Sequence, residues 1–362
     1  MRLHFSNFSP GFNVLYKRVV NIFTTVFRTS VPVVFHLGFK SESALKVLVR
    51  CHAISQFFSF FRYAFLNESF FKDIHNDTLM IYREFGKTGF KCSVIGMGTY
   101  YDPLWILGAK FFGLKKGEKK HTDAVTAGLD AGINLIDTAE LYGTEKLVSQ
   151  SISGRKRDEI FIATKVFFNH LRYDSVVKAC DRSLRNMGTS YIDLYQIHFP
   201  SKRVKIDETM RAMEKLVDDG KIRHIGISNF NLQRTKEAQA AMKKYEIVST
   251  QMPYNLSRRE FEKDLLPYCR ENRIAVLPYY PLGHGKLIDR NSWPQDLLNG
   301  MLEKYRIKST AQIALNWLIT KSDLIFPIPR ASSRDHVLDN AAAADWVIDA
   351  EDVVKLETAF PV

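Results

Sequence analysis

The chain has 362 residues, of which 46% are hydrophobic and 25% are charged, and these ordinary proportions exclude wholesale disorder, collagen and a coiled coil. The formal net charge of +12 is diffuse apart from a short lysine run at 115–120, so we expect no nucleic-acid partner. The cysteines stand far apart and form no CxxC, so we expect neither a disulfide scaffold nor a metal site, and we predict a reducing, cytoplasmic location. They are Cys51, Cys92, Cys180 and Cys269.

Residues 1–79 differ in composition from the rest of the chain. They hold 14 of the 26 phenylalanines and show neither a helical nor a strand period. Basic residues interrupt every apolar run, so no membrane span and no secretory signal is predicted. Three interpretations stay open: an acid-poor targeting peptide, a surface-binding extension, or a start assigned upstream of the true first residue, Met80. We favour the last, and expect an irregular N-terminal extension at 1–79 outside a domain at 80–362.

From Met80 the sequence becomes regular. Residues 82–85 and 90–93 flank Gly86-Lys87-Thr88-Gly89, which predicts a β-hairpin. Beyond it, short β-rich runs alternate with helical patterns. Eight strands, each followed by a helix, predict an α/β fold of the (β/α)8 TIM-barrel type, although alternation alone does not separate it from a doubly wound open sheet. The strands are expected at 93–97, 134–137, 160–164, 192–197, 224–227, 248–251, 275–277 and 324–328, and helices at 175–186, 208–219, 232–244 and 311–319.

A glycine pair after the first expected strand imitates a dinucleotide-binding fingerprint. Gly96 and Gly98 have the G-x-G spacing, but Tyr101 stands where the third glycine is needed, and no helix opens at once. We therefore reject a Rossmann fold. We expect these glycines to let the backbone approach a ligand or a neighbouring strand.

Polar residues follow three consecutive expected strands. Asp137 ends the second strand, and Tyr142 lies in the loop just beyond it. Lys165 ends the third strand and His198 the fourth. Singly, each has a structural explanation: a helix cap, a surface charge or a satisfied core histidine. In a barrel, however, these strand ends meet on the face that carries active sites, so their joint occurrence favours function.

These residue types suit proton transfer to a carbonyl oxygen. The ordinary tyrosine pKa of about 10 is too high for ready transfer near neutrality, and a lysine ammonium beside the phenol is expected to lower the pKa of Tyr142. The carboxylate of Asp137 would hold Lys165 in place, and the imidazole of His198 would orient the carbonyl. Such a set protonates an alkoxide as it forms.

Five stretches carry a wider pattern: GINLIDTA (132–139), DLYQIHFP (193–200), GKIRHIGISNF (220–230), QMPYN (251–255) and PYYPLG (278–283). In order and spacing they resemble the aldo-keto reductase family. The resemblance runs from Met80 to Val362 and leaves the extension without a counterpart. It implies a (β/α)8 barrel that binds a nicotinamide cofactor without a Rossmann domain and without a metal.

The resemblance also implies roles for individual residues. Tyr142 would be the general acid, supported by Lys165 and Asp137, with His198 orienting the carbonyl. Side chains with amide and hydroxyl groups would hold the nicotinamide carboxamide, and a tyrosine would stack on its ring. The implied contacts near the nicotinamide are Ser228, Asn229 and Gln251 to the carboxamide and Tyr279 to the ring, with Gly98, Thr99, Tyr100 and Leu282 as further cofactor contacts.

The segment after the eighth strand would hold the far end of the cofactor. Arg330 stands where the family often has a lysine for the adenosine 2′-phosphate, and a guanidinium suits phosphate well. Ser332 and the following helix N-terminus add donors, and Asn340 matches an adenine contact. His336 stands where many members have arginine. We therefore prefer NADP(H) as the cofactor, with NAD(H) as the alternative.

The substrate pocket is expected to be aromatic. Tyr101 and Trp105 follow the first strand, whereas Phe167 and Phe199 follow Lys165 and His198. This lining fits aldehydes, ketones or sugars, and the short C-terminal tail predicts an open pocket. We predict a monomeric or weakly associating NADP(H)-dependent oxidoreductase that transfers a hydride between nicotinamide and a small-molecule carbonyl or the matching alcohol. The alternative is a nucleotide-sensing regulatory subunit of the same fold with little turnover.

Overall fold

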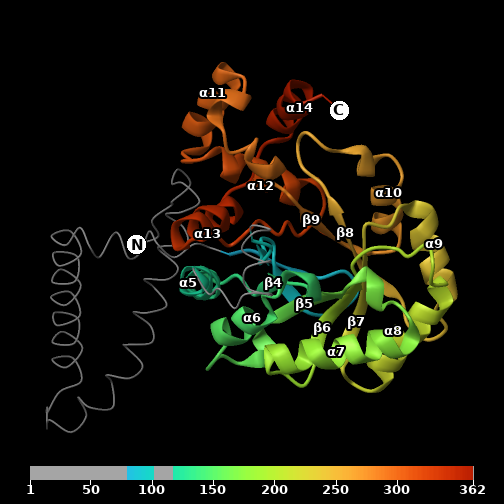
Figure 1. Ribbon diagram of the computed structural model, residues 1–362. Helices are drawn as coiled ribbons and strands as arrows, with labels where there is room; N and C mark the ends of the chain where they lie inside the picture. The colour runs from blue at the N-terminus through green and yellow to red at the C-terminus, as the bar shows by residue number, and fades with distance from the viewer. Residues whose placement is uncertain (1–79, 102–116, 362) are drawn as a thin grey trace, which may run out of the picture. The chain divides into compact units, whose positions relative to one another are not determined.

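The computed structural model describes residues 80–101 and 117–361, which fall within one compact unit spanning Asp77–Val362 (Figure 1). The expectations for residues 1–79, and that for Trp105 in the loop after the first barrel strand, lie outside the described residues. Within the two described ranges, no helix has the length and hydropathy that a membrane crossing requires.

A sheet of seven parallel strands forms the centre of the structure, and its strands pair strictly in chain order (Figure 1). A doubly wound open sheet reverses its strand order at a switch point, and no reversal occurs here. The strands are β3 (Met97–Gly98), β4 (Leu135–Asp137), β5 (Phe161–Val166), β6 (Ile192–Ile197), β7 (Ile222–Ser228), β8 (Ile247–Pro253) and β9 (Ala275–Tyr279).

The extended segment 324–330 closes the ring between β9 and β3. On the β9 side, the amides of Phe326 and Ile328 donate to β9 carbonyls at 2.8 and 3.1 Å. On the β3 side, the carbonyls of Pro327 and Pro329 accept amide hydrogens at 2.9 and 2.8 Å. Proline has no N–H, so the ladder towards β3 is interrupted and the expected eighth strand is not a regular one. The (β/α)8 barrel fold is confirmed.

The first barrel strand lies later than the sequence predicted. Residues 93–97 were expected to form it, but Ser93 belongs to the hairpin and β3 covers only Met97–Gly98. A Cβ at Gly98 would lie 2.8 Å from the carbonyl oxygen of Ile328. The glycine therefore permits the close approach of the closing segment, one of the two uses expected for it.

The predicted hairpin is present and fills the N-terminal end of the barrel. Its strands β1 (Tyr82–Glu84) and β2 (Lys91–Ser93) pair in antiparallel fashion. The buried ring of Phe85 lies 4.7 Å from the ring of Phe161 and 5.0 Å from that of Phe326, measured between centroids. The Phe85 ring of the hairpin thus packs between the strands at this end of the barrel. The predicted site residues lie at the opposite end, where the parallel strands finish.

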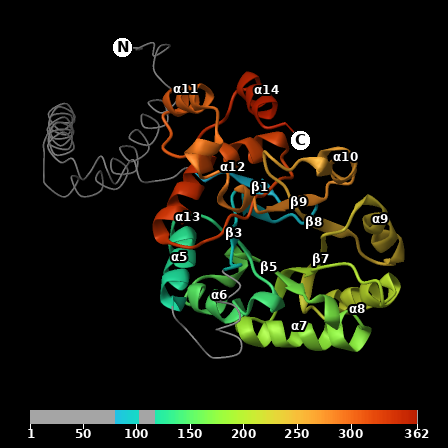
Figure 2. The same ribbon diagram turned by 45° about the horizontal axis from the view of Figure 1, so that its top comes forward.

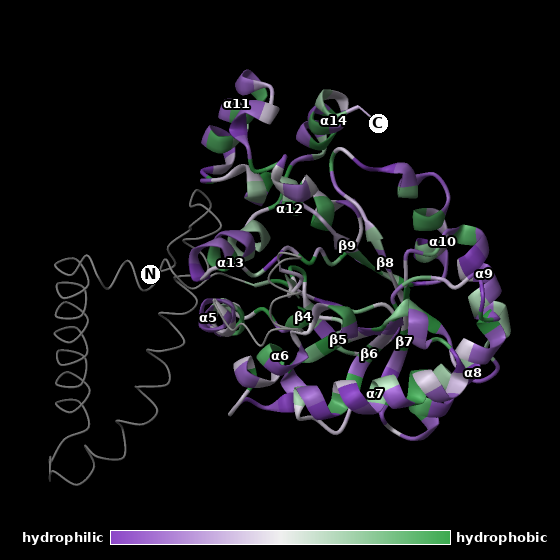
Figure 3. Cartoon of the chain, in the orientation of Figure 1, coloured by the Kyte–Doolittle hydropathy of each residue, from purple (hydrophilic) through white to green (hydrophobic). Residues whose placement is uncertain are grey.

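Helices surround the strands, as Figures 1 and 2 show from two directions. Helix α7 buries Val176, Ala179, Cys180 and Ser183 at helical spacing. Its exposed residues are hydrophilic, and Figure 3 shows both hydrophilic and hydrophobic residues along it. In the described residues the α-helices are α5 (Glu118–Asp130), α6 (Glu145–Ser151), α7 (Tyr173–Met187), α8 (Ile206–Asp218), α9 (Leu232–Ala241), α10 (Leu265–Glu271), α11 (Gln295–Tyr305), α12 (Thr310–Lys321), α13 (Arg334–Ala341) and α14 (Ala350–Ala359).

Helix α9 ends earlier than the helix expected at 232–244. Met242 is already extended, and the carboxylate of Glu214 accepts hydrogen bonds from the next three backbone amides, from residue 243 to residue 245. The Glu214 carboxylate, on helix α8, therefore stabilises a turn at residues 243–245, where the sequence pattern predicted that the helix continues.

Candidate active site

The C-terminal ends of the parallel strands bring the predicted polar residues together. Asp137 is the last residue of β4, and the 3₁₀ turn η1 (Glu140–Tyr142) follows it. Lys165 lies in β5, in register with the β6 residue two positions before His198. Their exposed fractions are 2% for Asp137, 0% for Lys165, 5% for His198 and 9% for Tyr142. The four side chains are therefore shielded from bulk water.

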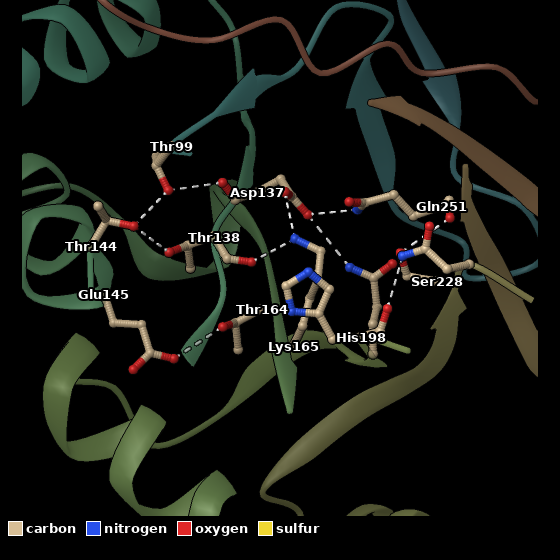
Figure 4. A network of polar contacts seen from close by, with 12 residues as sticks. Thr99, Asp137, Thr138, Thr144, Glu145, Thr164, Lys165, His198, Ser228 and Gln251 are labelled. Atoms are coloured by element: carbon tan, nitrogen blue, oxygen red, sulfur yellow. Dashed lines mark hydrogen bonds and ion pairs between the residues drawn. The ribbon is translucent and has the colours of Figure 1, made fainter. Parts of the chain in front are cut away.

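A buried ion pair anchors the site (Figure 4). The Lys165 ammonium donates to Asp137 Oδ2 at 2.7 Å and to the carbonyl oxygen of Thr138 at 2.8 Å. The second carboxylate oxygen of Asp137 accepts from Gln251 Nε2 at 2.8 Å. Burial lowers the pKa of Lys165, whereas the Asp137 carboxylate opposes that shift. A buried charge pair is tolerated when further hydrogen bonds support it, as those to Thr138 and Gln251 do here.

Tyr142 lies against this pair. The Lys165 ammonium is 4.9 Å from the centroid of the Tyr142 ring. The ring of His198 stands nearly perpendicular to that of Tyr142, with centroids 5.6 Å apart, and the ring of Tyr100 lies 5.0 Å away on another side. The Tyr142 ring, the Lys165 ammonium and the His198 imidazole, which come from different strand ends, therefore lie close together.

The pKa of Tyr142 is raised well above 10, chiefly by burial and next by the negative charge of Asp137. The nearby tyrosines Tyr280, Tyr100 and Tyr279 act in the same direction. The expected net lowering of this pKa is not seen in this structure, because burial and the negative charge of Asp137 outweigh what the Lys165 ammonium contributes. The phenol stays protonated at neutral pH, as a proton donor must.

His198 is neutral at any ordinary pH. Burial, and then the charge of Lys165, lower its pKa to about 3. Its Nδ1 atom is buried and has no hydrogen-bond partner among the described residues. A neutral imidazole can hydrogen-bond a carbonyl oxygen but cannot serve as a charged acid.

A chain of threonines supports the same loop, and sequence reasoning gave a role only to Thr99. The hydroxyl of Thr99 donates to the carbonyl oxygen of Asp137 at 3.0 Å and lies 2.9 Å from that of Thr144. The Thr144 hydroxyl is also 2.9 Å from the hydroxyl of Thr138, whose backbone carbonyl holds Lys165 (Figure 4). Threonine near a helix start is common as a cap, so the sequence carried no clear signal for this network.

The residues expected at the nicotinamide also form a connected group. Asn229 has a positive φ of 64°, an uncommon backbone conformation for a residue other than glycine. Its Nδ2 donates to the carbonyl oxygen of His198 at 3.0 Å and to Ser228 Oγ at 3.1 Å. Its Oδ1 accepts from the hydroxyl of Tyr279 at 2.7 Å, and Ser228 Oγ donates to the carbonyl oxygen of Gln251 at 3.1 Å. The group fixes the position of the Tyr279 hydroxyl.

The residues expected at the far end of the cofactor lie along the closing segment and α13. Arg330 is exposed and pairs with Gly98 through an isolated parallel bridge. Ser332 Oγ lies 2.9 Å from Nδ1 of His336, and Asn340 is buried in α13. Leu282, also expected at the cofactor, is half-buried and packs against hydrophobic clusters of the helical layer.

The expected substrate residues separate into two groups. Phe199 is 38% exposed and stacks on His198 with centroids 4.6 Å apart, and Phe167 lies beside the exposed Phe168. Tyr101 is only 2% exposed, stacks on His121 of α5 at 3.6 Å, and donates its hydroxyl to a backbone carbonyl. The Tyr101 ring therefore packs against α5, and its expected role at the substrate stays a prediction.

Metal-binding side chains do not gather in the part of the chain that the structure describes. No group of three or more His, Cys, Asp or Glu side chains there has a metal-binding arrangement. The three cysteines in the same ranges are buried and unpaired.

Comparisons with known proteins agree on one family. The model of the aldo/keto reductase family matches residues 106–359. Methylglyoxal reductase YeaE of Escherichia coli (strain K12) is 32% identical over 270 residues, which cover 74% of this chain and 90% of that protein. Glyoxal reductase of Bacillus subtilis (strain 168) is 34% identical over 238 residues, covering 65% of this chain and 82% of that protein.

A solved structure from the same family is also similar to this chain. The crystal structure of an aldo-keto reductase from Klebsiella pneumoniae in complex with NADPH has a TM-score of 0.69 and 32% sequence identity to this chain. The match covers 78% of this chain and 96% of that one.

Proposed function

Because the chain belongs to the aldo/keto reductase family, we propose that it reduces aldehyde and ketone carbonyl groups with NADPH. The observation that carries the proposal is the buried Lys165–Asp137 pair beside Tyr142, at the strand ends where a barrel holds its active site. The similar Klebsiella pneumoniae protein, solved in complex with NADPH, supports the choice of cofactor.

The side chains around the barrel mouth fit a nicotinamide. Ser228, Asn229 and Gln251 offer hydroxyl and amide groups within one hydrogen-bonded cluster, which is the donor and acceptor set that a carboxamide needs. Tyr279 presents a ring whose hydroxyl is held by Asn229, and an aromatic ring suits stacking on the nicotinamide. The nicotinamide, when bound, supplies a hydride to the carbonyl carbon.

The chain's own residues then complete the reduction. Tyr142 donates its hydroxyl proton to the carbonyl oxygen as the carbon–oxygen double bond becomes single, so the product is the alcohol. The Lys165 ammonium stabilises the phenolate left at Tyr142, and a proton from solvent restores it. Neutral His198 hydrogen-bonds the same oxygen and orients the carbonyl.

Short 2-oxoaldehydes are the substrates that the relatives suggest. The similar proteins from Escherichia coli and Bacillus subtilis are named as methylglyoxal and glyoxal reductases. Phe199, which is exposed and stacks on His198, adds an apolar ring beside the site, which favours aldehydes with an apolar substituent over sugars. We propose methylglyoxal and benzaldehyde as the first substrates, with glucose as the comparison.

The test is turnover by the purified chain. With NADPH and these three compounds, we expect loss of NADPH absorbance with both aldehydes and little with glucose. Tight NADPH binding without turnover on any carbonyl compound would instead support the regulatory-subunit alternative.

The expected pH profile of reduction follows from the pKa shifts of His198 and Tyr142. Since the pKa of His198 is lowered to about 3, we expect no change in kcat/KM around the ordinary histidine value of 6.5. Reduction needs Tyr142 protonated, and because its pKa is raised above the ordinary value of 10, we expect no fall in rate as the pH rises towards 10. Steady-state kinetics across this range check both points. A fall in rate as the pH drops through 6.5 contradicts a neutral His198.

The role of Arg330 in cofactor choice is tested by Arg330→Ala. Loss of a charged hydrogen bond to the 2′-phosphate, worth about 1.5–3 kcal/mol, is expected to raise the Kd for NADPH by about 10- to 100-fold. NADH lacks that phosphate, so its Kd is expected to stay within about twofold. Fluorescence titration measures both, with Arg155→Ala as the control. Equal weakening of NADPH and NADH binding contradicts a phosphate contact.

A further inference from the structure

The carboxylate of Glu140, two residues before Tyr142, joins three elements of the fold. Its Oε1 accepts from Arg182 Nη2 at 2.8 Å and lies 2.9 Å from His170 Nδ1. Its Oε2 accepts from the backbone amide of Phe167 at 3.0 Å. The side chain is only 15% exposed, which sets it apart from the freely solvated ion pairs of the surface.

These contacts connect the turn that carries Tyr142 to the loop that follows Lys165. Glu140 opens turn η1, Phe167 lies two residues beyond Lys165, and His170 ends the next turn, η3 (Phe168–His170). The third partner, Arg182, belongs to helix α7. One side chain therefore fixes the spacing between the two loops that bear the phenol and the ammonium.

The same turn is held from its other end by Thr144. The Thr144 hydroxyl lies 2.9 Å from the hydroxyls of Thr99 and Thr138. Between the two ends, Gly143 has a φ of 69°, and there is open space around the position of its missing side chain. A single backbone hydrogen bond, from Tyr142 to Ala139 at 3.0 Å, closes η1 itself. The position of Tyr142 thus depends on the contacts at both ends.

Glu140 is ionised when it accepts these hydrogen bonds. Burial alone would raise its pKa, but hydrogen bonds from Arg182, the Phe167 amide and His170 more than offset that effect and lower it. An ionised carboxylate has the acceptor capacity for three donors, which a neutral amide of the same shape lacks.

We propose that Glu140 is a positioning residue, which holds the hydroxyl of Tyr142 at the reacting carbonyl by fastening η1 to the loop after β5 and to α7. This inference rests on the proposed function, because it concerns the same reaction. A displacement of a reacting group by about 1 Å lowers a rate by about 100-fold. Loss of the Glu140 charge is thus expected to lower kcat while NADPH binding, which uses other residues, is kept.

The experiment compares Glu140→Gln, Arg182→Gln and the double variant of the full chain, with NADPH and methylglyoxal. Each single change is expected to lower kcat by about 10- to 100-fold, with the Kd for NADPH within about twofold of the wild type. Because the two residues act as one unit, the double variant is expected to be no slower than the slower single variant. Arg182→Lys, which keeps the charge, is expected to retain more of the rate.

Glu159→Gln is the matched control, since Glu159 also lies in a 3₁₀ turn and pairs with a lysine, but is 66% exposed. It is expected to leave kcat unchanged.

A Glu140→Gln enzyme with kcat within about twofold of the wild type overturns the inference, and so does a loss in kcat matched by an equal loss of NADPH affinity. If Glu140→Gln does not fold, an unchanged kcat in Arg182→Lys and Arg182→Gln overturns it. A wild-type chain without turnover overturns the proposed function as well, whereas turnover that survives Glu140→Gln overturns this inference alone.

Discussion

Replacing Tyr142 by phenylalanine is expected to lower kcat for carbonyl reduction by about 10²- to 10⁴-fold, the usual contribution of a general acid. Phenylalanine keeps the ring, whose edge-on contacts with Tyr100 and His198 place centroids 5.0 and 5.6 Å apart. The substitution therefore removes the proton donor and little of the packing. His198 cannot replace it, because its lowered pKa keeps the imidazole neutral. Single-turnover kinetics with NADPH and methylglyoxal measure the loss.

The control for this prediction is Tyr245→Phe. The Tyr245 hydroxyl bonds Asp218 between α8 and the end of α9, away from the strand ends, so kcat is expected to stay unchanged. NADPH binding to the Tyr142→Phe chain is expected to remain within about twofold of the wild type, which separates loss of chemistry from loss of fold. A variant that reduces methylglyoxal at the wild-type rate contradicts the assignment of Tyr142.

Removal of the Lys165 charge is expected to affect stability as well as activity. In Lys165→Met the carboxylate of Asp137, whose side chain is 3% exposed, loses its ion-pair partner. Leaving one member of a buried pair unpaired costs about 3–5 kcal/mol. We expect the free energy of unfolding in urea to fall by that amount, and the folded fraction to reduce carbonyls poorly because the phenolate of Tyr142 is no longer stabilised.

An exposed lysine provides the comparison. Lys156 pairs with Glu159 at 2.9 Å, but both side chains are mostly solvated, at 77% and 66% exposed. Lys156→Met is therefore expected to leave the free energy of unfolding nearly unchanged. Equal losses for the two lysine variants would show that burial of the Lys165–Asp137 pair contributes nothing to its strength.

Local chemistry explains how far the sequence could predict the fold. The Gly86–Gly89 turn and the apolar runs before Asp137 and Lys165 are local signals, and the hairpin and central strands appear where those signals lie. The closing segment differs because Pro327 and Pro329 withhold amides from one side of the ladder only, which depends on which neighbour each proline faces. That information is absent from the segment's own sequence.

In the site too, some features follow from the local sequence and others depend on residues far apart in the chain. Strand ends are local features, so the sequence alone could place Asp137, Lys165 and His198 at or beside the ends of neighbouring strands. The pKa of Tyr142 could not be predicted, because it depends on burial among tyrosines that lie far apart in the chain. Glu140 and Arg182 have no pattern of their own: a carboxylate in a short turn and an arginine on a helix both indicate a solvated surface. Tyr101 shows a further limit, since an aromatic after a strand end indicates a pocket, and nothing in the sequence indicates that its ring stacks on His121 of α5.

The central claim is that this chain directs a hydride from NADPH to a carbonyl carbon while its own residues protonate the oxygen. Reduction of methylglyoxal with NADPH that carries deuterium at the transferring C4 position tests it directly, with the product analysed by NMR. We predict one deuterium on the carbinol carbon for each NADPH oxidised. Bound NADPH that yields no labelled alcohol, or label that appears in water, would contradict the account.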